Sequence, residues 1–256
     1  MSNVLVCIKR VVDSTGEVVI TDDGQNVDGR YAGFTVSAHE EAAVELAVQI
    51  TAAGGGTGAL FTLGDETAEE QLRGALAMGC TAATHVKADS SAYGPSDVAR
   101  EIAAVVRDHE AAGTSHDLIL LGNDAADTGD FQVGIRLAYE LGRPVVNGAS
   151  TVTIEDGHAV AGVKGPDGHE VYRVPLPAIV TVLEGGVEPR YPSVPGRMKA
   201  KKVEIEVREP ATAPTGTKRV RLTLPPPQPS QVQILGKGPE AASAVVDLFE
   251  KLGVLR

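Results

Sequence analysis

The sequence has no tryptophan, few aromatic residues, only two cysteines and no long hydrophobic run. Aromatic residues make up 4% of its 256 residues, which argues against a stacking platform for single-stranded nucleic acid. Cys7 and Cys80 are too few for a disulfide framework or a cysteine-based metal site. No run reaches the length of a transmembrane helix or of a signal-peptide core. We therefore expect a cytoplasmic protein without stable membrane insertion.

The sequence also has no excess of basic over acidic residues. Lysine and arginine number 23 against 34 aspartate and glutamate, so the formal net charge is -11. Nucleic acids and anionic membranes both require a basic face on their partner, and this balance argues against either one. Hydrophobic residues make up 43% of the chain, which is ample for the core of one large α/β domain with an appended piece.

Apolar runs of strand length alternate with segments of helical periodicity through the first part of the chain. This alternation predicts an α/β fold with three layers, in which helices cover both faces of a doubly wound, mainly parallel sheet. The expected strands are Val4–Ile8, Ala59–Leu63, Thr84–Val86 and Leu118–Leu121, and the expected helices are Ala38–Ile50, Thr67–Met78, Gly94–Glu110 and a fourth that opens near Phe131 and Gln132. Ser37, followed by Glu40, has the spacing of a helix-capping box.

A β-hairpin region follows this alternation. Three short alternating runs are separated by Asp156-Gly157 and Asp167-Gly168, and both pairs are hairpin signals. An apolar strand over 177–182 returns to the sheet, and an isolated short strand is expected earlier, over 17–20. The three alternating runs are Thr151–Ile154, Ala159–Val163 and Glu170–Val174.

The leading candidate site is the loop Gly122–Asp130, between the strand at 118–121 and the helix that follows. Open α/β sheets bind ligands beyond the carboxyl ends of their strands, where loop amides and a helix N-terminus face an anion. An ordinary strand-to-helix connection explains the same pattern equally well. The glycine cluster Gly54–Gly58 precedes a strand instead of following one, which is the wrong order for a dinucleotide-binding loop.

Other polar residues give weaker signals. Lys9 and Arg10 end the first strand, where they could meet a phosphate or simply be solvated. The histidines show no ligand spacing. Acidic residues such as Asp124 and Asp127 are more typical of turns than of a cation site, so we predict no metal site.

The C-terminal part has a different composition. Residues 184–196 are rich in proline and glycine and lead into a basic segment that ends at Lys202. An alternating strand is expected over Lys218–Leu224 and an amphipathic helix over Pro239–Leu252. Such an arm either docks on another subunit or packs back on its own domain. We expect a domain over 1–207 and an arm over 208–256.

Several of these stretches together resemble one family, the β subunit of electron transfer flavoprotein. The most specific is Glu188–Lys202, together with Leu176–Thr181 before it. Val4–Asp13 is similar to the first strand and turn of that family, and Gly74–Gly79 is similar to a further stretch of it. The segment from Gly122 to Gly134 resembles its nucleotide loop. The resemblance spans roughly the first 207 residues.

This resemblance implies a Rossmann-like, adenine-nucleotide-binding fold in a heterodimer with an α subunit. FAD shared with the α subunit would carry the electrons, and AMP would lie in a crevice of the β subunit. Flavin-dependent dehydrogenases would deliver electrons at a recognition loop over 184–202, and a quinone reductase or another acceptor would receive them. The arm over 208–256 would dock on the α subunit. The chain would be an electron-carrier subunit, and we nominate no catalytic residue.

The resemblance also implies roles for individual residues. Matching positions assign nucleotide binding to Cys7, Ser37, Leu63, Gly64, Gly122, Ala125, Asp127, Phe131, Gln132, Val133 and Gly134. They assign partner binding to Tyr191, Val194, Pro195, Met198 and Lys199.

Two alternatives stay open. Gln132-Val133-Gly134 is more similar to the electron-bifurcating branch of the family, in which a second FAD replaces AMP. The α/β pattern alone also permits a nucleotide-hydrolysing or ligase-like enzyme, or a nucleotide sensor without redox chemistry. Against an enzyme of that class, the first strand is followed neither by a pyrophosphate loop nor by a nucleophile and base pair.

Overall fold

The computed structural model describes every residue except 14, 16, 217–218, 227–228, 230–231 and 255–256. Within the described residues a nine-stranded sheet has the order β11-β5-β4-β1-β6-β10-β7-β8-β9. Its strands are β1 (Val4–Cys7), β4 (Gly58–Gly64), β5 (Ala82–Lys87), β6 (Leu118–Gly122), β7 (Val145–Glu155), β8 (His158–Gly165), β9 (Gly168–Pro175), β10 (Ala178–Val182) and β11 (Ile205–Arg208), and a separate antiparallel pair is formed by β2 (Val11–Val12) and β3 (Phe34–Thr35).

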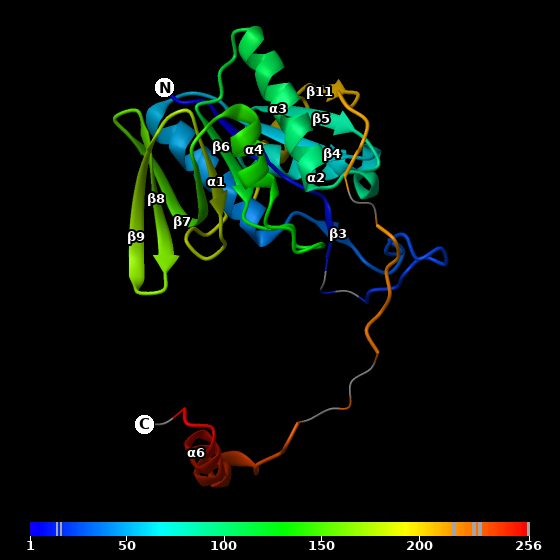
Figure 1. Cartoon of the computed structure of the whole chain (residues 1–256), viewed down its shortest axis with the longest axis vertical. Coiled ribbons are helices and arrows are strands. Elements are labelled where there is room, and N and C mark those ends of the chain that lie inside the picture. The colour runs from blue at the N-terminus through cyan, green and yellow to red at the C-terminus, as the bar shows by residue number, and fades with distance from the viewer. Residues whose placement is uncertain (14, 16, 217–218, 227–228, 230–231, 255–256) are drawn as a thin grey trace. The chain divides into compact units, whose positions relative to one another are not determined.

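Helices cover both faces of the sheet, as Figure 1 shows. One face packs against α1 (Ala38–Gly54) and α2 (Glu69–Met78), and the other against α3 (Pro95–Ala111) and α4 (Val133–Leu141). The predicted three-layer, doubly wound α/β fold is therefore confirmed. Two further helices are α5 (Val194–Ala200) and α6 (Ala241–Lys251), and short 3-10 turns lie at Glu66–Ala68, Ser90–Ala92 and Gly238–Glu240.

The central strand β1 shows why the first apolar run forms a buried strand. Val4 and Val6 join the core on one face, whereas Leu5 and Cys7 join the core on the other. Strand side chains alternate between faces, so an unbroken apolar run is what a strand covered on both sides requires. β1 pairs in parallel with β4 on one side and with β6 on the other.

The start of α1 follows the predicted capping box. The Ser37 side chain accepts a hydrogen bond from the Glu40 amide, and the Glu40 carboxyl accepts one from the Ser37 amide. Both amides would otherwise lack partners at the first turn of the helix. The cap therefore fixes where α1 begins, immediately after the β2–β3 pair.

The hairpin region is also confirmed. β7, β8 and β9 are antiparallel neighbours; Asp156-Gly157 forms the turn between β7 and β8, and Asp167 lies in the turn between β8 and β9, with Gly168 as the first residue of β9. β10 then returns to the centre of the sheet, parallel to both β6 and β7.

Several sequence-based expectations are wrong in detail. The strand expected over 17–20 is reduced to one bridge between Ile20 and Val27. No strand is present over 219–224, because that segment pairs with no neighbouring strand, and Lys218 lies outside the described residues. The apolar residues of α4, which are Val133, Ile135, Leu137, Ala138 and Leu141, predict that Ile135 is on the buried face, but Ile135 is exposed and Gly134 is buried.

β11 and α5 were not predicted. β11 has the alternating sequence Ile-Glu-Val-Arg and pairs in parallel with β5 at the end of the sheet. α5 is short, and Ser193 caps it by accepting a hydrogen bond from the Gly196 amide. Because proline and glycine usually interrupt helices, the sequence of α5 does not indicate a helix, although proline is favourable in a first turn.

The chain divides into two compact units, 1–222 and 223–256. The first unit thus includes residues 208–222, which the sequence analysis assigns to the arm. In the second unit, α6 forms where an amphipathic helix was predicted, and none of its residues is buried. Docking of this arm on another subunit stays a prediction. Among the described residues, no helix combines the length and the apolar character needed to cross a membrane.

His116, two residues before β6, is a buried titratable group, 3% exposed. Its Nε2 lies 3.0 Å from Nδ1 of His109, whose Nε2 lies 2.8 Å from a carboxylate oxygen of Glu206 on β11. Burial, aided by the charges of His109 and Arg143 and opposed by Asp117, lowers the pKa of His116 from 6.5 to about 4. The folded protein therefore favours the neutral imidazole.

This lowered pKa predicts a pH-dependent contribution to stability. The unfolded chain binds a proton at His116 below pH 6.5 and the folded chain does not, so acidification favours unfolding. Between pH 7.5 and 5.5 the cost is about 1 kcal/mol. We expect the stability deficit of His116→Asn relative to the parent to shrink by that amount over the same range, measured by urea denaturation. A deficit independent of pH would contradict the neutral, buried histidine.

Candidate functional site

A crevice of about 1100 Å³ opens at the carboxyl ends of the central strands. β4 and β5 lie on one side of β1, whereas β6 and β10 lie on the other, so the strand order reverses between β1 and β6. At such a switch point the connections after neighbouring strands leave toward opposite faces of the sheet and create a ligand-binding crevice. The walls are formed by the segments after β1, β4 and β6, together with the N-terminal ends of α3 and α4.

Two glycines allow elements around the crevice to approach closely. A Cβ atom on Gly134 would lie 2.4 Å from Cγ2 of Thr181, where the first turn of α4 packs on β10. A Cβ atom on Gly122, at the end of β6, would lie 2.9 Å from Cγ of Glu40. The first amides of α4 have no acceptor within their own helix, and this N-terminal end lines the crevice. The site therefore offers an anion a helix N-terminus at close range.

Basic side chains line the crevice together with a larger number of acidic ones. Nζ of Lys9 lies 2.7 Å from Oδ1 of Asp127, and this ion pair ties the end of β1 to the loop after β6. The Arg10 guanidinium stacks 3.4 Å from the centre of the Phe34 ring. Its Nε is buried and has no hydrogen-bond partner in the described part of the chain. An anionic ligand would supply such a partner.

Glu40 connects the helix cap to the crevice. Its two carboxyl oxygens accept hydrogen bonds from the amides of Lys9 and Ser37, at 3.0 and 3.2 Å. Burial raises the pKa of Glu40 to about 8, against the effect of these hydrogen bonds. Burial and the neighbouring Glu40 also raise the pKa of the Cys7 thiol, so Cys7 is a neutral wall of the crevice and not a nucleophile.

Nine of the eleven residues assigned to the nucleotide line this crevice, although they come from three strand ends and one helix. Ser37 and Phe131 do not line it: Ser37 caps α1, and Phe131 is exposed beside the N-terminal end of α4. Their roles as nucleotide contacts stay predictions. The nine lining residues are Cys7, Leu63, Gly64, Gly122, Ala125, Asp127, Gln132, Val133 and Gly134.

Other lining residues carried no signal in the sequence analysis. Tyr93 and Gly94 precede α3, and Asn26 and Val27 belong to the loop before β3. Gly216, Arg219 and Leu222 lie far along the chain, in a segment that was assigned to the arm. Only the tertiary structure brings these segments to the crevice, so no local motif marks them.

The residues assigned to partner binding lie together on and beside α5. Tyr191, Val194, Pro195, Met198 and Lys199 are all exposed. Val194 and Met198 are 76% and 56% exposed and lie four residues apart on α5, so both apolar side chains are on one face of the helix.

Buried contacts hold this exposed segment in place. Arg190 binds Glu45 of α1 through two hydrogen bonds of 2.8 Å each, and the Glu45 side chain is buried. Arg73 of α2 donates to the carbonyl oxygens of Ala200 and Val203, both at 2.6 Å. A bidentate pair with a buried carboxylate fixes orientation as well as position. The segment is therefore a preformed surface.

Comparison with known proteins shows to which family this chain belongs. The family model described as the electron transfer flavoprotein domain matches residues 27–213. The chain belongs to the electron transfer flavoprotein family. Among curated relatives, the electron transfer flavoprotein subunit beta of Bacillus subtilis (strain 168) is 34% identical over 96% of this chain and 97% of its own length.

Further curated relatives are similar to this chain at comparable identity. The subunit beta of Syntrophomonas wolfei is 33% identical over 90% of this chain and 89% of its own length. The human subunit beta is 34% identical over 81% of each chain. The resemblance to electron transfer flavoprotein β subunits is therefore confirmed, and this family consists of electron carriers.

The close packing at Gly134 gives a testable prediction. Thr181 cannot move freely, because its hydroxyl donates to Oδ1 of Asn123 and accepts from the Gly148 amide. We expect Gly134→Ala to lower the free energy of unfolding by about 1–3 kcal/mol through overpacking.

A matched control is Gly74→Ala. Gly74 also lies in a helix, but a Cβ atom there meets nothing within 4 Å. This variant should be more stable than the parent by about 0.5–1 kcal/mol, because alanine favours helices. Both effects are measured by chemical denaturation, and equal changes in the two variants would contradict the packing described for α4.

Proposed function

We propose that this chain is the β subunit of a heterodimeric electron transfer flavoprotein and that it binds an adenine nucleotide in the crevice between β1 and β6. The observation that carries the proposal is the convergence of nine family-assigned residues on that one crevice. They come from three separate parts of the chain, at Cys7, at Leu63–Gly64 and within 122–134, and sequence proximity does not explain why these three parts meet. The family membership supplies the expectation of an α subunit as partner.

AMP is the proposed ligand of the crevice. Its phosphate would meet the N-terminal end of α4 and the guanidinium of Arg10, whose Nε lacks a partner in the described structure. The apolar walls near Cys7 and Leu63 suit the flat adenine ring. Burial raises the pKa of Glu40, which reduces the negative charge that this carboxyl would present on the same wall to a bound anion. In this proposal AMP has a structural role.

The redox cofactor is proposed to be FAD shared with the α subunit. Bound flavin supplies the electron storage, whereas the protein supplies binding, orientation and electrostatics. In this proposal flavin-dependent dehydrogenases deliver the electrons, and a quinone reductase or another acceptor removes them. The chain is thus an electron-carrier subunit, proposed to act in the cytoplasm.

The segment around α5 is the proposed docking surface for dehydrogenases. Val194 is the central apolar anchor, and Pro195, Met198 and Tyr191 extend the apolar area around it. Lys199 adds a positive charge beside them, which favours an acidic partner and makes association depend on salt. Because Arg190 and Arg73 hold this segment on α1 and α2, docking would need little ordering of the surface.

A second FAD in place of AMP is the second candidate, and one observation favours it. The crevice volume of about 1100 Å³ slightly exceeds the usual upper limit of about 1,000 Å³ for ligand pockets and is more than a mononucleotide needs. In that case the complex would bifurcate electrons. A nucleotide sensor or a nucleotide-hydrolysing or ligase-like enzyme has no comparable support, because the matched family carries electrons.

The nucleotide content of the complex tests the proposal. Co-expression with the α subunit should give a yellow heterodimer, and denaturation should release one FAD and one AMP per heterodimer, measured by chromatography. Two FAD and no AMP would establish the bifurcating alternative. A flavin-free homodimer purified from the native host would contradict the proposed function.

The docking surface gives a separate prediction. Val194→Asp places a charge at the centre of the apolar anchor, so electron transfer from the dehydrogenase should be lost while flavin content stays unchanged. Val207→Asp is the matched control, because Val207 is also an exposed valine but lies on β11. Transfer is measured as the rate of flavin reduction by the dehydrogenase. Equal rates in Val194→Asp and the parent would show that Val194 is not the anchor.

A further inference from the structure

Two carboxylates of α3 are buried although neither lies in the main cores. Asp97 is 0% exposed and Glu101 is 1% exposed, and they are one helical turn apart. A buried carboxylate needs hydrogen-bond donors or an opposite charge. Both find their donors in the same distant segment, residues 211–216.

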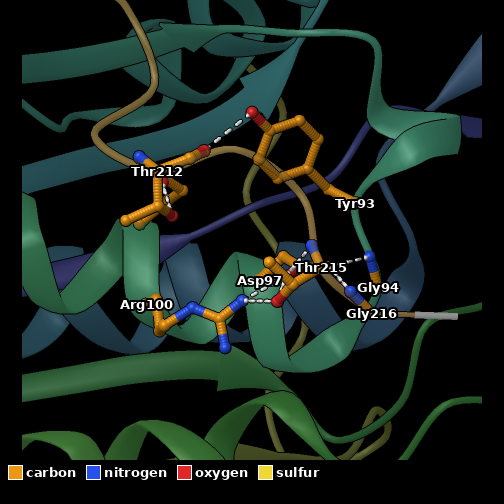
Figure 2. A network of polar contacts seen from close by, with 8 residues as sticks. Tyr93, Gly94, Asp97, Arg100, Thr212, Thr215 and Gly216 are labelled. Atoms are coloured by element: carbon orange, nitrogen blue, oxygen red, sulfur yellow. Dashed lines mark hydrogen bonds and ion pairs between the residues drawn. The ribbon is translucent and has the colours of Figure 1, made fainter.

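Asp97 binds the end of that segment (Figure 2). Its carboxylate accepts hydrogen bonds from the amides of Thr215 and Gly216, at 2.9 and 3.0 Å, and from the Gly94 amide at 3.1 Å. Arg100 forms an ion pair with it. Burial alone would raise the pKa of Asp97, but these amides outweigh burial and keep the pKa below its ordinary value. Asp97 is therefore an anion held by backbone amides.

Glu101 binds the beginning of the same segment. It accepts hydrogen bonds from the amides of Ala211 and Thr212, at 2.7 and 2.8 Å, and from the Thr212 hydroxyl at 2.7 Å. The Tyr93 hydroxyl donates to the Thr212 carbonyl oxygen at 3.1 Å (Figure 2). The hydrogen bonds to the Glu101 carboxylate are charge-assisted, and such bonds are about twice as strong as neutral ones. Residues 211–216 are thus fixed along α3.

Residues 219–222 are fixed to a different part of the first unit. The Leu222 amide donates to the Gly24 carbonyl oxygen at 2.8 Å. The Gln25 side chain donates to the Val220 carbonyl oxygen at 3.0 Å, and Arg219 donates in return to the Gln25 carbonyl oxygen. This second attachment lies in the loop between β2 and β3, on another wall of the crevice.

Both attached pieces line the crevice itself. Gly216 lines the crevice together with Tyr93 and Gly94. Arg219 and Leu222 line it together with Asn26 and Val27. The described residues 211–216 and 219–222, called the strap below, therefore lie at two walls of the crevice. Arg219 adds a guanidinium group to a lining that already includes Arg10.

We propose that the strap closes the crevice over the bound nucleotide and that Asp97 is the positioning residue that latches it. The inference rests on the proposed function, because it takes the nucleotide of the crevice as its ligand. Asp97 binds the strap and not the nucleotide. Release of the nucleotide then requires the strap to leave Asp97. The factor by which the latched strap strengthens nucleotide binding is also the factor by which bound nucleotide stabilises the latched strap.

Two substitutions open the latch from opposite sides. In Gly216→Ala the new Cβ atom would lie 2.7 Å from Oδ2 of Asp97, so the strap or the carboxylate must shift, and the hydrogen bond from the residue 216 amide is distorted. In Asp97→Asn one acceptor oxygen becomes an NH₂ group, which faces amide donors. Gly54→Ala is the matched control, because a Cβ atom on Gly54 meets nothing within 4 Å.

The experiment uses the full heterodimer loaded with radiolabelled AMP. Release of label is followed after addition of excess unlabelled AMP, and trypsin cleavage after Arg219 and Arg221 is followed with and without AMP. In the parent and in Gly54→Ala, AMP should slow cleavage at these two sites at least tenfold. In Gly216→Ala and Asp97→Asn, AMP should be released at least tenfold faster and should no longer protect either site.

The outcomes separate the strap from the function on which it rests. A parent heterodimer that binds no AMP would overturn the AMP assignment itself. A parent that binds AMP, with release from both variants at the parental rate, would overturn the strap alone. If neither variant folds, the parent heterodimer still tests the strap. Trypsin cleavage after Arg219 and Arg221 at the same rate with and without AMP would overturn the proposal. If trypsin cleaves Asp97→Asn faster at many sites but AMP still slows cleavage after Arg219 and Arg221, Asp97 has only a structural role.

Discussion

The parallel pairing of β1 with both β4 and β6 is the constraint on which the rest of the structure depends. Because the chain leaves β1 toward β4 and returns later to β6, the strand order reverses there. A right-handed crossover on each side then places helices on opposite faces, and the connections separate at the carboxyl ends of the strands. The crevice is the space that this separation leaves, so its position follows from topology before any particular side chain is considered.

Buried carboxylates attach the irregular segments to this framework. Glu45 of α1 holds Arg190, and thereby the exposed segment around α5. Asp97 and Glu101 of α3 hold the strap. Each of these acids lies on a helix and binds a segment that contributes little to the apolar core. Part of the acidic excess of the chain therefore has an internal role, because each carboxylate replaces water with fixed amide or guanidinium donors.

The sequence predicts those features that depend on neighbouring residues. The apolar run at 118–121 and the Ser37–Glu40 capping box are local signals, and both appear in the structure as expected. β11 was missed because its formation depends on the free edge of β5, which is distant in sequence. The strap was missed for the same reason, since its donors meet Asp97 only after α3 has packed. Nine of the site residues follow from family resemblance, whereas Arg219 carries no local signal.

The central claim is that the crevice between β1 and β6 holds an adenine nucleotide. A crystal structure of the heterodimer, purified with its native nucleotides, tests it most directly. We expect density for an adenine nucleotide whose phosphate lies at the N-terminal end of α4, with Arg10 within hydrogen-bonding distance and Gly216 and Arg219 in the walls around it. A crevice containing only solvent, or a nucleotide bound elsewhere on this chain, would contradict it.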